Sequence, residues 1–152
     1  MRRWIFMEEA SFWPAARQEA ALQELRRSLP VCERFGLTLT EEEMAGLEQE
    51  HQRALAAAGR VEFGGGVLPQ LIAAFCDSPY VERANWAQTL CELQEAFYFY
   101  KSEAEERFTD DELVEFMAAV FNGCAQGSTE YLAGTSLEEL CRRARRGGEA
   151  PD

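Results

Sequence analysis

The chain has 152 residues, of which 47% are hydrophobic, and its 15 basic and 27 acidic residues give a formal net charge of -12. This length and apolar content predict one folded domain with its own core over residues 1–152. The negative charge opposes binding to phosphate backbones and anionic membranes, and no segment has the length of a membrane span. We therefore expect neither nucleic acid nor a membrane as a partner.

The cysteines indicate a reducing compartment. Their number is odd and none forms a C-x-x-C pair, which fits neither a disulfide framework nor a zinc knuckle. They are Cys32, Cys76, Cys91, Cys124 and Cys141. The apolar run near the start ends at Glu8 and Glu9, too early for a signal sequence. These features predict reduced thiols, several of them buried, and a cytoplasmic location.

Helical signals follow one another along the chain with little strand signal between them. We expect Pro30 to end the first helix. Thr40 and Glu43 form a capping box that opens the second helix, and Gly59 supplies its left-handed stop. The expected helices cover about 11–29, 41–58, 68–76, 82–106, 110–122 and 136–146.

Three further capping signals lie in the second half of the chain. Thr109 with Glu112 forms a second capping box, which opens the helix predicted over 110–122. Ser128 is placed to cap a short helical turn. Thr135 with Glu138 forms a third box, which opens the last helix.

The longest predicted helix has a continuous apolar face. Its residues at three-and-four spacing are Trp86, Leu90, Leu93, Phe97 and Tyr100. The four successive aromatic residues 97–100 point in nearly every direction around the axis, as expected of a helix surrounded by others. The fold class is therefore predicted as all-α, an irregular bundle of about five to six helices around a long central helix.

The two ends of the chain are expected to add little to the bundle. We expect residues 1–10 to form an arm that is flexible or packs on the bundle, and 147–152 to form a frayed tail. The arginines at 142, 143, 145 and 146 complement the dipole at the end of the last helix. The apolar residues near the start are Trp4, Ile5, Phe6, Phe12 and Trp13.

Glu48 and His51 have the E-x-x-H spacing that places a carboxylate and an imidazole on one helix face. A di-iron site needs two such motifs, whereas the chain contains one histidine. A packed, hydrogen-bonded histidine is therefore the favoured interpretation. The acidic start of the helix at 110 resembles an EF-hand, but the following loop lacks its oxygen ligands. We expect no metal and no cofactor.

No complete catalytic constellation is visible. A thiol or hydroxyl nucleophile needs a base within reach, and the only imidazole is that of His51. Cys124 is the thiol expected to be most accessible. Acidic pairs such as Glu92 with Glu95 would serve hydrolysis only if they faced a cleft. We therefore expect a protein without enzymatic activity. An enzyme stays open only if the chain binds a small molecule or an anion.

The glycine-rich loop 60–66 is the sharpest local signal. Three glycines, Gly64, Gly65 and Gly66, precede a short helix whose free amides can receive an anion, with positive charge from Arg60. The lysine and spacing of a P-loop are missing. The glycines can equally serve to let two helices cross closely.

Six stretches carry a resemblance to other proteins, namely 59–66, 74–80, 93–95, 97–101, 109–113 and 131–134. Through them the chain resembles an uncharacterised family of small acidic α-helical proteins from Gram-positive anaerobic bacteria. The likeness spans about 35–134. It implies a bacterial cytosolic setting and brings no assigned activity and no catalytic residues.

Two functions remain open. The leading hypothesis is a non-enzymatic module that binds another protein, or itself, through an apolar or aromatic groove. The alternative is a small-molecule or anion-binding protein, with or without enzymatic activity, built where a hairpin-like arrangement brings the glycine loop beside the turn 77–80. The candidate binding residues for this alternative are Arg60, Glu62, Gly64, Gly65, Gly66, Asp77, Ser78 and Tyr80.

Overall fold

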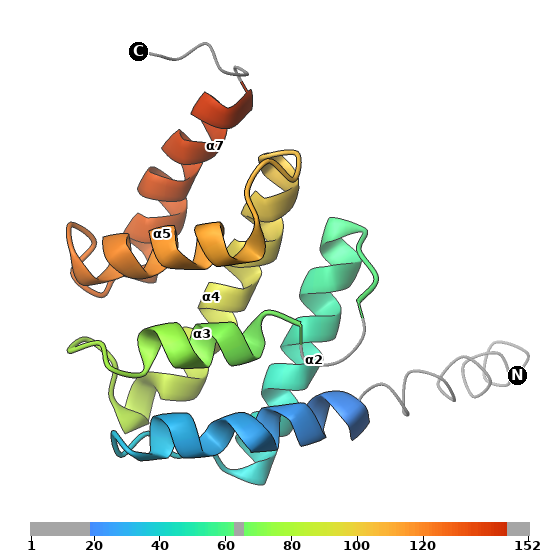
Figure 1. The fold of residues 1–152 in the computed structure, drawn as a ribbon, viewed down its shortest axis with the longest axis vertical. Coiled ribbons are helices and arrows are strands. Elements are labelled where there is room, and N and C mark those ends of the chain that lie inside the picture. The colour runs from blue at the N-terminus through green and yellow to red at the C-terminus, as the bar shows by residue number, and fades with distance from the viewer. Residues whose placement is uncertain (1–18, 63–65, 146–152) are drawn as a thin grey trace, which may run out of the picture.

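The structure, a computed structural model shown in Figure 1, describes residues 19–62 and 66–145. Every regular element in these ranges is helical, so the predicted all-α bundle is confirmed. The elements are a first helix over 19–33, α2 (Glu41–Ala58), α3 (Leu68–Phe75), α4 (Arg83–Glu103), α5 (Asp110–Asn122), α6 (Thr129–Tyr131), the π-helix η1 (Leu132–Leu137) and α7 (Glu138–Arg145). None of these described helices is long and apolar enough to cross a membrane. The predicted arm 1–10 and tail 147–152 lie outside the described residues.

α4 is the central helix, as predicted. It contacts α2, α3, α5, α6 and α7, and its most extensive interface is with α2. Its apolar face is fully buried at Trp86, Leu90, Leu93 and Phe97. The expectation that neighbours surround it on every side is wrong at Phe99, which is 54% exposed. One side of α4 therefore faces outward, between its contacts with α2 and with α6.

The two predicted capping boxes at Thr40 and Thr109 are present. The Thr40 hydroxyl accepts a hydrogen bond from the Glu43 amide at 3.0 Å, and the Glu43 carboxylate accepts one from the Thr40 amide at 2.9 Å. Thr109 and Glu112 repeat this arrangement at the start of α5. Gly59 ends α2 with a φ of 69°. Both helices begin at the predicted residues because their own side chains satisfy the free amides of the first turn.

The prediction that Pro30 ends the first helix is wrong, since the helix continues to Glu33. Proline removes one amide donor, but the extra turn places Cys32 in the core with no exposed surface. A turn over residues 34–36 follows the helix, and it closes at Gly36, whose φ is 79°. The amides of Gly36 and Leu37 donate to the carbonyls of Glu33 and Cys32, the hydrogen-bond pattern of a Schellman motif.

α4 ends earlier than the predicted 106. The backbones of Glu105 and Glu106 are left-handed, with φ values of 57° and 61°. The buried Lys101 draws the following chain back, because its ammonium lies 2.8 Å from the Asp110 carboxylate and donates to the Phe108 carbonyl. A buried ammonium needs such partners, and this need stops the helix where local sequence alone does not.

The cap at Ser128 is confirmed, because its hydroxyl accepts a hydrogen bond from the Tyr131 amide at 3.0 Å. The capping box predicted at Thr135 and Glu138 is wrong. The π-helix η1 joins α6 to α7 without a break, so Thr135 lies inside a helix. The Glu138 carboxylate instead accepts a hydrogen bond from the Tyr100 hydroxyl of α4 at 3.3 Å. The Glu138 side chain, which the capping box would need, is thus used in a contact with α4.

Two exposed glycines test the backbone assignments without disturbing any packing. A Cβ at Gly46, inside α2, or at Gly36 would have no atom within 4 Å. We expect Gly46→Ala to stabilise the fold by about 1 kcal/mol, because alanine favours a helix interior. We expect Gly36→Ala to destabilise it by about 1 kcal/mol, because its φ is left-handed. Urea denaturation measures both changes, and shifts of the same sign would contradict the assignments.

Candidate functional site

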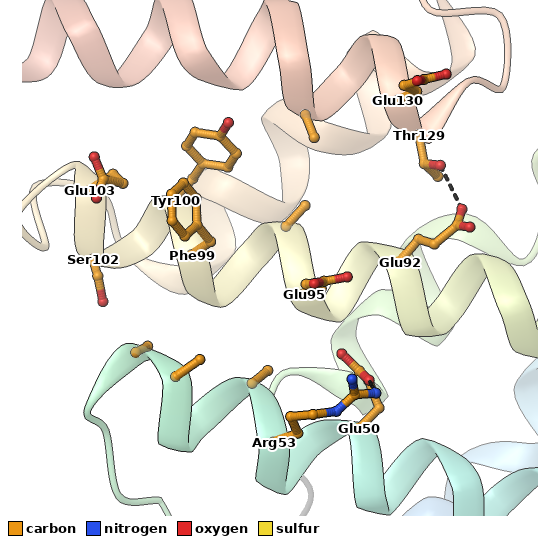
Figure 2. A pocket seen from close by; sticks show the side chains of 15 residues that line it. Glu50, Arg53, Glu92, Glu95, Phe99, Tyr100, Ser102, Glu103, Thr129 and Glu130 are labelled. Carbon is orange, nitrogen blue, oxygen red and sulfur yellow. Dashed lines mark hydrogen bonds and ion pairs between the residues drawn. The ribbon is translucent and has the colours of Figure 1, made fainter.

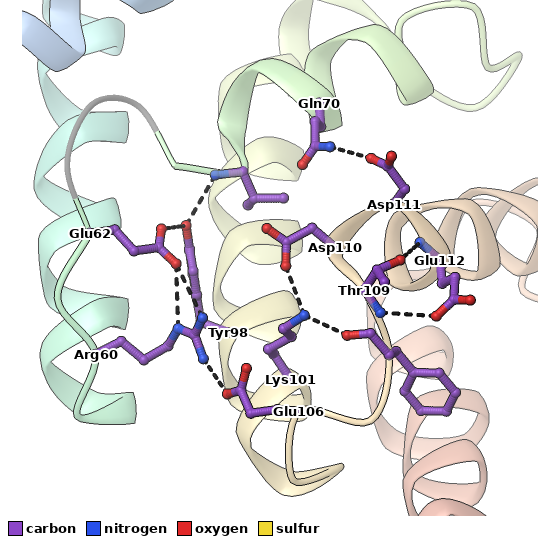
Figure 3. A network of polar contacts seen from close by, with 12 residues as sticks. Arg60, Glu62, Gln70, Tyr98, Lys101, Glu106, Thr109, Asp110, Asp111 and Glu112 are labelled. Carbon is purple, nitrogen blue, oxygen red and sulfur yellow. Dashed lines mark hydrogen bonds and ion pairs between the residues drawn. The ribbon is translucent and has the colours of Figure 1, made fainter.

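Arg60 and Glu62, two of the predicted binding residues, lie side by side and are paired with each other. Nη2 and Nε of Arg60 lie 3.3 and 3.4 Å from Oε2 of Glu62. Arg60 also forms an ion pair with Glu106, which follows α4 (Figure 3). The loop after α2 is therefore tied to the far end of α4. The charge that would attract an anion is already shared between two carboxylates.

His51 lies directly behind this loop. It has no exposed surface, and its Nδ1 lies 3.3 Å from Oε1 of Glu48, while its Nε2 lies 4.0 Å from Oε1 of Glu62. Burial lowers the pKa of His51, but the two carboxylates raise it by more, to about 9. The imidazole is therefore protonated at neutral pH. His51 is the packed, hydrogen-bonded histidine that the sequence favours, and it stabilises two acidic side chains.

Tyr98 of α4 connects the same loop to the start of α3. Its hydroxyl donates to Oε1 of Glu62 at 2.9 Å and accepts a hydrogen bond from the Val67 amide at 3.1 Å (Figure 3). Burial raises its pKa, so the hydroxyl stays protonated. The pKa of Glu62 is lowered, mainly by His51, because every close polar neighbour favours its charged form. These contacts join α2, the start of α3 and α4, although the buried Nε2 of His51 has no hydrogen-bond partner among the described residues.

Gly66 explains why this loop needs a glycine. Its φ is 61°, and a Cβ there would lie 2.4 Å from both His51 Nε2 and the Tyr98 hydroxyl. The backbone of Gly66 thus fills the space above the cluster, which favours the structural role of the glycine over a ligand pocket. Gly64 and Gly65 lie outside the described residues.

The turn that carries Asp77, Ser78 and Tyr80 lies at the other end of α3. The Ser78 hydroxyl donates to the Asn122 side chain at the end of α5, and the Tyr80 ring packs edge-on against Phe121. The eight residues of α3, about 12 Å of helix, separate this turn from the glycine loop. The hairpin-like arrangement is therefore not formed, and Asp77 is simply exposed. The two halves of the predicted site contact different elements.

A groove of about 720 Å³ lies elsewhere, on the outward side of α4 (Figure 2). α4 forms its floor, and α2 and the α6–η1 segment form its walls. The apolar lining consists mostly of small side chains with two aromatic rings, and comprises Ala54, Ala57, Ala58, Ala96, Ala133, Phe99 and Tyr100. The groove thus combines an apolar base with room for an incoming group.

Acidic side chains surround this base. The glutamates of the lining are Glu50, Glu92, Glu95, Glu103 and Glu130, against a single arginine, Arg53. Arg53 pairs with Glu50, and the Thr129 hydroxyl donates to Glu92 at 2.6 Å (Figure 2). Burial raises the pKa of Glu50, Arg53 partly offsets this, and Glu95 raises it further. Five carboxylates beside one guanidinium make the groove strongly negative.

The sequence indicates only part of this surface. Glu92 and Glu95 form an acidic pair that serves hydrolysis only if it faces a cleft, and both residues line the groove. The missed signal is their spacing to Phe99, which continues the same helical stripe and is exposed. The facing stripe of α2 carries Arg53 and alanines at the same spacing. Neither stripe alone indicates that the two helices border one groove.

No group of three or more His, Cys, Asp or Glu side chains in the described ranges has an arrangement that could hold a metal ion. In comparisons with known proteins, the model of a family described as a family of unknown function (DUF6323) matches residues 24–150. No curated protein and no solved structure matches the chain. The match supports the resemblance to an uncharacterised family and brings no site residue with it.

Gly66→Ala tests the close approach over His51. We expect it to destabilise the fold by about 2–4 kcal/mol, because it adds both backbone strain and a clash with two buried polar groups. Gly36→Ala is the matched control, since it has the same left-handed φ but open space around it. Equal losses for the two variants in urea denaturation would show that the contact with His51 is absent.

The buried His51 predicts a pH dependence of stability. Its pKa is about 9 in the folded state against an ordinary 6.5, so its stabilisation is fully present below pH 6.5 and is lost as pH rises toward 9. Between these values the free energy of unfolding falls by about 1.4 kcal/mol per pH unit. Since the chain contains one histidine, His51→Gln flattens the profile between pH 6.5 and 8. A wild-type profile that is already flat there would contradict the assignment.

Proposed function

This chain belongs to DUF6323, a family of unknown function, and we propose that it is a non-enzymatic module that binds a basic, amphipathic helix of another protein. The binding site is the acidic groove on the outward side of α4. The observation that carries the proposal is the combination of an apolar base with five glutamates and one arginine around it.

The shape of the groove suits a helix. Its two walls are helical, and small alanine side chains on α2, α4 and η1 line the space between them. Small residues at such positions let another backbone approach closely, so that an added helix packs by its ridges between those of its neighbours. An amphipathic helix then buries its apolar face on the base, as in other helix-in-groove complexes.

Phe99 supplies the main apolar contact of the proposed interface. It is 54% exposed, its ring lies edge-on to Tyr100 with centroids 4.8 Å apart, and both rings line the groove. Exposed aromatic side chains held in place by a neighbour are frequent hot spots of protein interfaces. Covering Phe99 removes apolar surface from water without rearranging the core.

The charge of the groove defines the partner. Glu95 is exposed and lies on the floor opposite Glu50, whose single described cationic neighbour is Arg53. Lysine or arginine side chains on the polar edges of a bound helix would balance these carboxylates. A basic helix is therefore favoured over an acidic or neutral one.

The alternative of an anion or small-molecule site at the glycine loop has weaker support. Arg60, its expected cation, contacts the carboxylates of Glu62 and Glu106, which compete with any incoming anion. Gly66 fills the space over His51. A cytoplasmic setting is part of our proposal, and it is compatible with the five cysteines, none of which forms a disulfide in the described structure.

A fluorescein-labelled amphipathic peptide made of leucine and lysine tests the groove. We expect Phe99→Ala to weaken its binding about tenfold, or about 1.4 kcal/mol, in fluorescence polarisation. Phe35→Ala is the matched control, since Phe35 is 50% exposed but lies outside the groove. Glu95→Lys also weakens binding, whereas Glu115→Lys, the same charge change on α5, has a smaller effect. Equal losses within each pair would exclude the groove as the binding site.

A further inference from the structure

We propose that residues 1–7 of this chain occupy the acidic groove intramolecularly and compete with the basic helix of a partner. This inference rests on the proposed function, because it assigns a regulator to the same groove. Residues 1–7 read M-R-R-W-I-F-M, so two arginines stand directly before four apolar residues. They lie outside the described part of the chain and outside the matched range 24–150.

The composition of this segment complements both the negative charge of the groove and its apolar base. Arg2 and Arg3 carry charge opposite to that of the glutamates around the groove, and guanidinium groups bind carboxylates through two parallel hydrogen bonds. Trp4 and Phe6 are large apolar groups for the alanine-lined base beside Phe99. In a chain with net charge -12, a basic and aromatic segment has an acidic groove as its complementary surface.

The segment can reach the groove. The first helix lies near the start of α2, because Arg26 forms an ion pair with Glu41 at 3.2 Å. About 10 Å of helix separates Glu19 from Arg26, and about 14 Å separates Glu41 from Glu50 at the edge of the groove. The spacing between the two packed helices, about 10 Å, adds to this path. Residues 8–18 span up to about 40 Å when fully extended, which covers the path. Docking within one molecule therefore requires residues 11–18 to be extended in the docked state instead of helical, and it requires no change in the described helices.

Tethering makes a weak contact effective. A segment joined by a short linker has a local concentration on the order of millimolar, so even a short basic and aromatic stretch fills its site for much of the time. The apparent affinity for a partner falls in proportion to the fraction of free grooves. The N-terminal segment thus sets a threshold that a partner helix must exceed.

The full-length protein tests this through the leucine–lysine peptide and through NMR. We expect Trp4→Ala/Phe6→Ala, which changes no charge, to raise the affinity for the peptide by about threefold to tenfold. Arg2→Glu/Arg3→Glu has the same effect, whereas Arg27→Glu/Arg34→Glu, the same charge change on exposed residues outside the groove, has a smaller one. The amide signals of Glu95 and Phe99 shift in the first two variants and not in the third.

The outcomes separate the inference from the function on which it rests. If wild type and Trp4→Ala/Phe6→Ala bind the peptide equally and their groove amide signals coincide, the segment does not dock, while the proposed function stands. If neither binds the peptide, the proposed function fails, and the amide signals alone decide whether the segment docks. Groove signals that depend on protein concentration, together with a dimer in sedimentation, would overturn intramolecular docking in favour of a second copy.

Discussion

α2 packs along α4, and this interface sets the positions of both the polar cluster and the groove. Within this interface the buried side-chain amide of Gln94 donates to a backbone carbonyl of α2 at 3.2 Å. Such a bond favours one register, because sliding the helices would leave buried polar groups without partners. The same register places His51 beside Tyr98, with ring centroids 5.8 Å apart, and sets Glu50 in the groove with Glu95. The polar cluster and the groove are two edges of one interface.

The polar cluster and the groove differ in how their acidic side chains are balanced by cationic ones. In the cluster, the carboxylates of Glu48 and Glu62 face the protonated His51, with Arg60 and Tyr98 completing the contacts of Glu62. Burying charge is costly unless it is paired in this way, and the pairing ties three helices and a loop together. In the groove, by contrast, glutamates outnumber cationic side chains. The balanced cluster therefore serves the fold, and the unbalanced groove is the surface available for binding.

The candidate site shows why local patterns predicted so little of function. Glycine, arginine and acidic residues near 60–66 indicated an anion site, but Gly66 approaches His51 and Arg60 pairs with Glu106, a residue far away in sequence. The turn at Tyr80 is a neighbour along the chain, yet it packs on α5. Conversely, the stripe through Glu95 looks like an ordinary solvated face until another helix borders it. Long-range contacts decided each of these cases.

Local sequence patterns are enough to predict the all-α class, the central helix and the helix boundaries at Thr40, Gly59 and Thr109, because hydrophobic periodicity and capping act over a few neighbouring residues. Tertiary structure decided where burial or pairing outweighed local preference, as where the first helix continues past Pro30 to bury Cys32. The groove forms only in the tertiary structure. An acidic stripe and an alanine stripe become one binding surface only when packing in the core sets the register of their helices.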